Sequence, residues 1–512
     1  MSSVVFPAQP SVPIDKQRTV FNWIIQAVAH TMPFVLLTSI VLFVHGYHPY
    51  SQDAAIYLVG IEKGLNPSLF KANMPFVVSQ TRLSIFSPAI VTLIRATGLR
   101  LNVFIFITYL ASVALFLLAC RKLAVRLFKT EWEQWGATLL PAALFTIPIA
   151  GTSLLMMDPY ITARSFSTPL SIFAIVSCLD RSWKKVALWT IVVSLLHPLM
   201  GALLLCFLLI LSLIIMKRRK LAVKMCFVGV LISGLFFFTS YFQVTTQAYR
   251  DVLATRDNLF LVEWHWYEVL GLIAPTLLMT ITATRSEFHI MRRQLATTCV
   301  LVGLTSMLVA LLFVHPDHPG ILVRIQVLRS FLLVYCIGAV MLGGFLVSWF
   351  WKRGIWVGIT FFAIAFYGMF IADSLSYVQS SRLELPGATV VNPWTQAFLW
   401  IRGNTPTTAF FASDSTTFTI QDKDVQGFRA IAERDILSGA KDGGVATLFP
   451  RLAPRWLRYR EAEKGIDHMT DSERIARLSP FGVTWILLQP QSKTFMRCPY
   501  RNEVVAVCRL IP

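Results

Sequence analysis

The stretch SFLLVYCIGAVMLGGFLVSW, residues 330–349, runs for twenty residues without a charged side chain. A helix needs about 20 apolar residues to cross a hydrocarbon core of roughly 30 Å, so this stretch predicts a transmembrane helix. The whole 512-residue chain has a matching composition, since 55% of its residues are hydrophobic and only 14% are charged. An ordinary soluble domain has about 25% charged residues. The sequence therefore predicts a multi-pass membrane protein and excludes soluble, disordered, collagen-like and disulfide-scaffold classes.

Apolar runs recur along the chain and predict further membrane helices at 22–44, 102–120, 136–156, 165–179, 221–242, 267–283, 295–314 and 355–371. The first run is too long for a signal peptide and predicts an uncleaved anchor. The stretch 186–216 is too short for two full crossings. His197-Pro198 lies near its middle, where proline interrupts a helix. We predict a shallow hairpin with arms at 186–197 and 199–216, which gives a mainly helical polytopic protein with about 11 membrane segments.

The positive charge of the chain, +19 at pH 7, gathers in alternate loops. Lys and Arg cluster at 16–18, 121–129, 181–185, 217–224, 285–293 and 352–353. The positive-inside rule places these loops in the cytoplasm, so the N-terminus is inside and the C-terminal region is outside. Basic residues in such loops orient the protein and contact anionic headgroups. Membrane lipids are therefore predicted partners, and no nucleic acid is predicted as a partner.

The first outer loop, residues 45–101, contains HGYHPYSQDAAIYLVGIEKGLNPSLFKANMPF. Ser51 is a candidate N-cap, and the following Gly-Leu-Asn-Pro is a stop signal, which together predict a helix at about 52–63. Asp53 then falls in the first turn, where the helix dipole keeps a carboxylate ionised. Such a carboxylate either only stabilises its helix, or acts as a general base or metal ligand. Residues 83–98 predict an interfacial helix in the same loop.

Other groups able to bind or catalyse map to the outer segments, namely His48, Asp158, Arg164, His197, Arg324 and Arg329. Asp158 and Arg164 stand six residues apart and either pair with each other or serve a site. His197 is either a hydrogen-bonding residue at a helix end or a residue that faces a ligand. Arginines at a membrane entrance either extend to the lipid headgroups or bind a phosphate with both nitrogens.

The composition changes at about residue 372, where long apolar runs stop and Pro, Gly, Asp and Arg return. We therefore divide the chain into a membrane domain, 1–371, and a soluble outer domain, 372–512. Predicted helices and strands alternate in the second part, which is typical of a small α/β domain. Cys498 and Cys508 either form a disulfide across a hairpin, if the compartment is oxidising, or remain free thiols.

This layout resembles the GT-C superfamily of membrane glycosyltransferases, over most of the chain and as an architecture rather than as strict motifs. The shared features are a first span that starts inside, a long first outer loop with interfacial helices, the acid of Tyr50-Ser-Gln-Asp53, the hairpin at Leu196-His197-Pro198 and an outer C-terminal domain. The chain is most similar to the poorly characterised bacterial branch, which implies a place in the bacterial inner membrane.

The resemblance implies transfer of a sugar from a polyprenyl-phosphate-linked donor to a hydroxyl of a glycan, lipid or protein acceptor at the outer face. It implies that Asp53 is the catalytic base and that His197 lines the site. Arg324 or Arg329 would neutralise the lipid phosphate. Many members of the superfamily carry two acids in this loop, whereas here Ser51 and Gln52 precede a single Asp53. No metal ion or other cofactor is therefore predicted.

Two other function classes stay open at this point. A transporter or flippase of a lipid-linked or small substrate would typically show inverted repeats and helices broken at mid-membrane. The two halves of this sequence do not repeat each other, and its polar groups lie at the outer boundary instead. A non-catalytic envelope-assembly protein would use the outer domain as a binding module.

Overall fold

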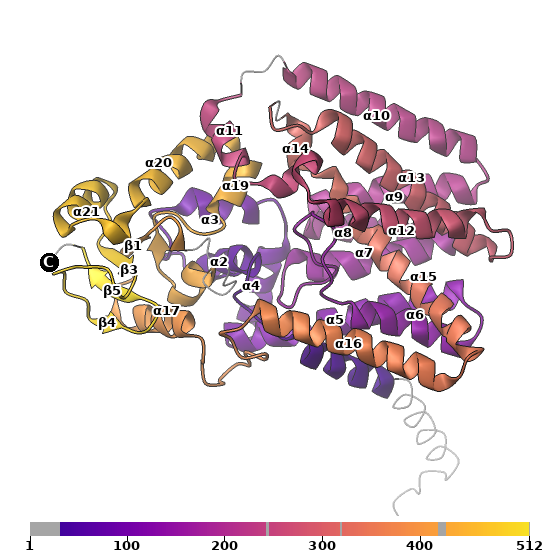
Figure 1. Ribbon diagram of the computed structural model, residues 1–512, viewed down its shortest axis with the longest axis horizontal. Helices are drawn as coiled ribbons and strands as arrows, with labels where there is room; N and C mark the ends of the chain where they lie inside the picture. Colours follow the sequence, from indigo (N-terminus) through magenta and orange to yellow (C-terminus); the bar gives the residue numbers. More distant parts are fainter. Residues whose placement is uncertain (1–30, 242–244, 318–319, 418–425, 511–512) are drawn as a thin grey trace, which may run out of the picture.

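A bundle of long helices occupies one side of the computed structural model, and a smaller domain built on a sheet occupies the other (Figure 1). The structure describes residues 31–241, 245–317, 320–417 and 426–510. The prediction of a mainly helical chain with several apolar spans and a small C-terminal sheet is confirmed. The first residues of the predicted 22–44 span lie outside the described part.

Among the described residues, seven helices are long and apolar enough to cross a membrane. They are α5 (Leu101–Leu127), α9 (Pro198–Ile215), α10 (Arg219–Tyr241), α12 (Trp266–Thr284), α13 (Ile290–Phe313), α15 (Phe331–Trp351), which follows α14 (Ile321–Ile325), and α16 (Ile355–Ser376). The bundle also contains shorter apolar helices, Thr31–His45 and α7 (Ala163–Leu179). The loops that join α12 to α13 and α15 to α16 lie at the end of the bundle away from the sheet (Figure 1).

The predicted membrane span at 136–156 is wrong. The helix found there, α6 (Glu131–Ala143), has only 13 residues and contains Pro141. The chain beyond it is irregular and folds back through an isolated bridge between Pro148 and Leu155. Most apolar side chains of this segment are buried inside the protein. The apolar run therefore reflects burial, which composition alone does not distinguish from a membrane helix.

The His-Pro hairpin is present where the sequence predicts it. α8 (Trp183–Leu196) and α9 pack against each other, and His197 separates them. Pro198 stands at the first position of α9, where a missing amide hydrogen costs no helical bond. α9 has 18 residues, the length of the predicted arm, and is long and apolar enough to cross a membrane.

The first loop contains three helices, α2 (Ala54–Leu65), α3 (Met74–Thr81) and α4 (Phe86–Thr97). α2 and α4 occupy the two predicted helical segments. The predicted N-cap is wrong, because Asp53 rather than Ser51 precedes α2, and its side chain makes no capping bond. The Asp53 carboxylate accepts a hydrogen bond from Arg164 instead. α3 and α4 meet at a bend of 93°, and together they could form one broken span.

The C-terminal domain contains a five-stranded sheet in the order β2-β1-β3-β5-β4. The strands are β1 (Phe410–Ser413), β2 (Asp435–Ile436), β3 (Trp485–Leu488), β4 (Tyr500–Arg501) and β5 (Ala506–Arg509). β1 runs parallel to both neighbours, whereas β5 runs antiparallel to its own. The helices of the domain are α17 (Pro393–Asn404), α18 (Phe428–Ala432), α19 (Asp442–Leu448), α20 (Ala453–Glu463) and α21 (Asp471–Leu478). α11 (Gln247–Leu253), from the loop before α12, packs on α19 and α20.

Cys498 and Cys508 form a disulfide in the described C-terminal domain. Cys508 belongs to β5 and is fully buried, so the bond fastens the segment before β4 to the interior of the sheet. The remaining cysteines are free. Of the two alternatives left by the sequence, the structure contains the disulfide.

Candidate functional site

A cavity of about 720 Å³ lies where the first loop, the membrane helices and the C-terminal domain meet. Its volume falls in the range of small-molecule sites. Of the residues singled out in the sequence, it is lined by Asp53, Arg164, His197, Arg324 and Arg329. These residues come from distant parts of the chain, and the fold brings them to one place.

Arg164 stands between two carboxylates at the start of α7. Its Nη1 donates to Asp53 Oδ2 at 2.9 Å, and its Nη2 donates to Asp158 Oδ2 at 2.9 Å. Thr162, the N-cap of α7, donates to the same Asp158 oxygen. Arg164 and Asp158 are both about 95% buried. Asp158 and Arg164 therefore do pair, and the pair also holds the side chain of Asp53.

The second cation at Asp53 comes from the C-terminal domain. Lys441 Nζ lies 3.6 Å from Asp53 Oδ1 and donates to Gln52 Oε1 at 2.7 Å. Burial of Asp53 disfavours its charge, but Arg164 and Lys441 outweigh this effect and hold the pKa of the carboxyl well below its usual range. Asp53 is thus ionised throughout the physiological pH range, with a cationic side chain beside each oxygen.

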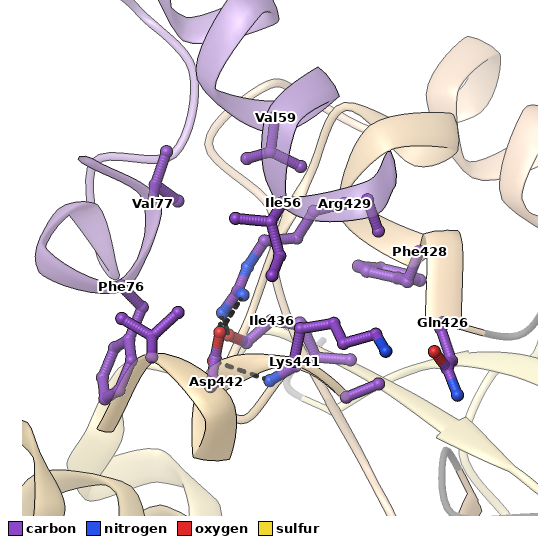
Figure 2. A pocket seen from close by; sticks show the side chains of 14 residues that line it. Ile56, Val59, Phe76, Val77, Gln426, Phe428, Arg429, Ile436, Lys441 and Asp442 are labelled. Atoms are coloured by element: carbon purple, nitrogen blue, oxygen red, sulfur yellow. Dashed lines mark hydrogen bonds and ion pairs between the residues drawn. The ribbon is translucent and has the colours of Figure 1, made fainter. Parts of the chain in front are cut away.

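A buried ion network fixes the segment that carries Lys441. Arg429 donates to both oxygens of Asp442 at 2.6 and 2.8 Å and to Asp435 Oδ1 at 3.1 Å. The backbone amide of Asn73, in the first loop, donates to the other oxygen of Asp435 at 2.7 Å. Figure 2 shows Arg429 reaching Asp442 next to Lys441, with side chains of α2 and α3 on the facing side. The network therefore fastens the C-terminal domain to the first loop and sets the position of Lys441.

Three arginines in the cavity wall are unpaired, namely Arg256, Arg324 and Arg329. Their guanidinium groups form no ion pair or hydrogen bond with any described residue. The Nε atoms of Arg256 and Arg329 are buried without a partner. Gln326, whose φ is +49°, makes the sharp bend between α14 and the turn that carries Arg329. Because an unpaired buried polar group costs free energy, these guanidinium groups favour an anionic ligand.

His197 makes the helix-end hydrogen bond that the sequence offers, and it also lines the cavity. It is the N-cap of α9, where its Nδ1 accepts from the Met200 amide at 3.4 Å, and it lines the cavity. Burial, followed by the charges of Arg164 and Arg329, lowers the pKa of His197 to about 3. The imidazole is therefore neutral. Since Nδ1 accepts, Nε2 carries the proton and is the available donor.

His48 lies behind the cavity rather than in its wall. It is fully buried, its Nδ1 contacts Glu384 Oε1 at 2.9 Å, and its ring stacks on Tyr377 at 3.6 Å. Burial disfavours its charge, but Asp373 and Glu384 outweigh burial and raise the pKa of His48 to about 9. Tyr377 itself lines the cavity. His48 and Asp158, which the sequence offers as substrate-binding residues, thus contact the cavity-lining residues Tyr377 and Arg164 and do not line the cavity themselves.

The described residues contain no group of three or more His, Cys, Asp or Glu side chains placed to hold a metal ion. Asp53 is the single acidic residue in the described wall of the cavity, which also contains the basic residues Arg164, Arg256, Arg324, Arg329 and Lys441. Sequence reasoning missed Lys441 and Arg256, which come from segments without a recognisable motif. The electrostatics of this wall suit an anionic ligand.

No protein-family model matches the chain. No curated protein matches it either. Among solved structures, the chain is similar to the archaeal oligosaccharyltransferase AglB from Archaeoglobus fulgidus, solved in complex with an inhibitory peptide and a dolichol-phosphate. The superposition has a TM-score of 0.43 and 10% sequence identity, and it covers 91% of this chain and 70% of that chain.

Proposed function

We propose that this protein is a membrane glycosyltransferase that moves a sugar from a polyprenyl-phosphate-linked donor to an acceptor hydroxyl. The observation that carries the proposal is one cavity that holds an ionised carboxylate, Asp53, together with unpaired arginines, Arg256, Arg324 and Arg329. Guanidinium groups bind phosphate through paired hydrogen bonds. A carboxylate can orient a hydroxyl and receive its proton. The cavity lies at the ends of membrane helices, where a phosphate attached to a lipid would be located.

In the proposed reaction, the acceptor oxygen attacks C1 of the sugar. The bond between C1 and the phosphate oxygen breaks, and polyprenyl phosphate leaves with the electron pair. The arginines stabilise the charge that develops on the phosphate. The hydroxyl proton passes to Asp53. Because its pKa is low, Asp53 is a weak base that accepts the proton only as the acceptor oxygen bonds to C1 and becomes acidic.

We also propose that the C-terminal domain lies outside a bacterial inner membrane. The loops that join α12 to α13 and α15 to α16 are basic and lie at the end of the bundle away from this domain (Figure 1). Basic loops favour the cytoplasmic side. The disulfide between Cys498 and Cys508 supports an oxidising compartment for the domain. The sugar transfer would then occur at the outer face, with a glycan, lipid or protein as acceptor.

Replacing Arg329 with glutamine is expected to raise the Kd for undecaprenyl phosphate by about tenfold or more, the scale of one hydrogen bond to a charged group. The measurement is a binding titration of the full chain in detergent. The matched control is Arg458→Gln, at an exposed arginine of α20. An unchanged Kd in Arg329→Gln would contradict a phosphate site at Arg329. An equal loss of affinity in Arg329→Gln and Arg458→Gln would contradict it as well.

Replacing Lys441 with methionine tests whether the C-terminal domain takes part in the reaction. Lys441 stabilises the ionised form of Asp53, so its removal raises the pKa of that carboxyl. The carboxylate is then lost at a higher pH, and the acid limb of the pH–rate profile is expected to move upward. Lys464→Met, at an exposed position of the same domain, is the control. An unchanged acid limb would contradict the proposed action of Lys441 on Asp53 in the reaction.

A further inference from the structure

A second cavity, of about 590 Å³, lies on the other side of α2 from Asp53. Asp53 precedes α2 and faces the first cavity, whereas Leu58, Glu62 and Leu65 of α2 face the second. The first residues of α5 form another wall, so this cavity also lies at the end of a helix long enough to cross a membrane. A ligand of the second cavity would be separated from Asp53 by the body of α2.

The second cavity contains a buried carboxyl group without a partner. Glu62 is 4% exposed, and its Oε2 is buried with no hydrogen bond. The other acids of the wall are engaged, because Glu384 contacts His48 at 2.9 Å and Glu433 contacts Arg402 at 2.6 Å. Burial raises the pKa of Glu62 well above its usual range. A buried carboxyl in this state is stabilised most by a ligand that donates hydrogen bonds or positive charge to it.

The rest of the wall favours a ligand with an apolar part and a phosphate. The apolar lining includes Leu58, Leu65, Leu69, Leu101, Ile105 and Leu385. Arg100 lines the same cavity as the N-cap of α5, a helix of 27 residues. A helix N-terminus and an arginine together attract phosphate. The cavity thus combines an acid, a helix N-terminus with an arginine, and an apolar surface.

We propose that the second cavity binds a phospholipid with a primary ammonium headgroup, with the ammonium on Glu62 and the phosphate on Arg100. A primary ammonium offers three hydrogen-bond donors to a carboxyl group. A choline headgroup has the same charges but no N–H group, and a glycerol headgroup has donors but no positive charge. This assignment concerns binding at a site apart from Asp53, and it does not rest on the proposed sugar transfer.

The test measures lipid binding to the full chain in detergent by native mass spectrometry, with dioleoyl phosphatidylethanolamine, phosphatidylcholine and phosphatidylglycerol compared at equal concentration. We expect the ethanolamine lipid to bind about tenfold or more tightly than the other two, the scale of one hydrogen bond to a charged group. Glu62→Gln is expected to remove this preference. The matched control, Glu263→Gln at an exposed glutamate, is expected to retain it.

A second variant keeps the test independent of how well Glu62→Gln folds. Leu65→Trp fills the apolar part of the cavity from α2 and leaves Glu62 in place. This variant is expected to weaken binding of the ethanolamine lipid to an extent similar to that of Glu62→Gln. Equal binding of the three lipids to the unaltered chain would overturn the proposal. Stronger binding of the glycerol lipid would overturn the ammonium assignment, and so would an ethanolamine preference that survives Glu62→Gln.

Discussion

Replacement of Asp53 with asparagine is expected to lower the rate of sugar transfer by about 10²–10⁴-fold, the usual contribution of a general base. Asparagine has the same shape but cannot accept the hydroxyl proton. Donor binding is expected to persist, because the three arginines that would hold the phosphate are unchanged. The measurement is release of free polyprenyl phosphate from a polyprenyl-phosphate sugar by the purified full chain, alongside a binding titration.

The matched control is Asp257→Asn, at an exposed aspartate outside the described wall of the cavity. It is expected to transfer sugar at the rate of the unaltered protein. Folding of Asp53→Asn is expected to be retained, since Arg164 keeps its bond to Asp158. A folded Asp53→Asn protein with full activity would show that the cavity does not use this carboxylate in catalysis.

Replacement of Arg164 with methionine is expected to reduce the free energy of unfolding by about 3–5 kcal/mol, the usual cost of breaking a buried ion pair. Arg164 is 5% exposed and pairs with Asp158, which is 4% exposed. Its removal leaves that buried carboxylate without a cation. Sugar transfer is expected to fall as well, because Arg164 also holds Asp53. Thermal or denaturant unfolding of the full chain in detergent measures the first effect.

A double-mutant cycle separates the free energy of the ion pair between Arg164 and Asp158 from the other effects of the Arg164 substitution. Asp158→Asn introduced into Arg164→Met removes the unpaired buried charge, so it is expected to restore part of the lost stability. Activity is expected to stay low in the double variant, because Asp53 still lacks the bond from Arg164. Strictly additive losses of stability would contradict the ion pair. Recovery of full activity would contradict the positioning of Asp53 by Arg164.

Local sequence signals predicted the features that depend on neighbouring residues. The length of the apolar runs predicts most of the long helices, and His197-Pro198 predicts the break between α8 and α9. The six-residue spacing of Asp158 and Arg164 allowed the pair that the structure contains. Each of these depends on residues close together in the chain. The run at 136–156 predicts a span that the structure does not contain, because burial in protein and burial in lipid select the same side chains.

The parts of the site that depend on distant contacts could not be predicted. Lys441 contacts Gln52, which stands 389 residues earlier, and no local pattern encodes such a contact. His48 was expected to contact a substrate, but its fully buried ring is held by Glu384, 336 residues later. Burial and pairing change the role of a polar residue without changing its sequence context.

The proposed function requires that the Asp53 cavity binds a polyprenyl-phosphate-linked donor. The most direct test is an experimental structure of the full chain with undecaprenyl phosphate. We predict that the phosphate lies within hydrogen-bond distance of the guanidinium groups lining this cavity, Arg256, Arg324 and Arg329, on the same side of α2 as Asp53. A phosphate bound in the second cavity, or one that contacts none of these arginines, would contradict the claim.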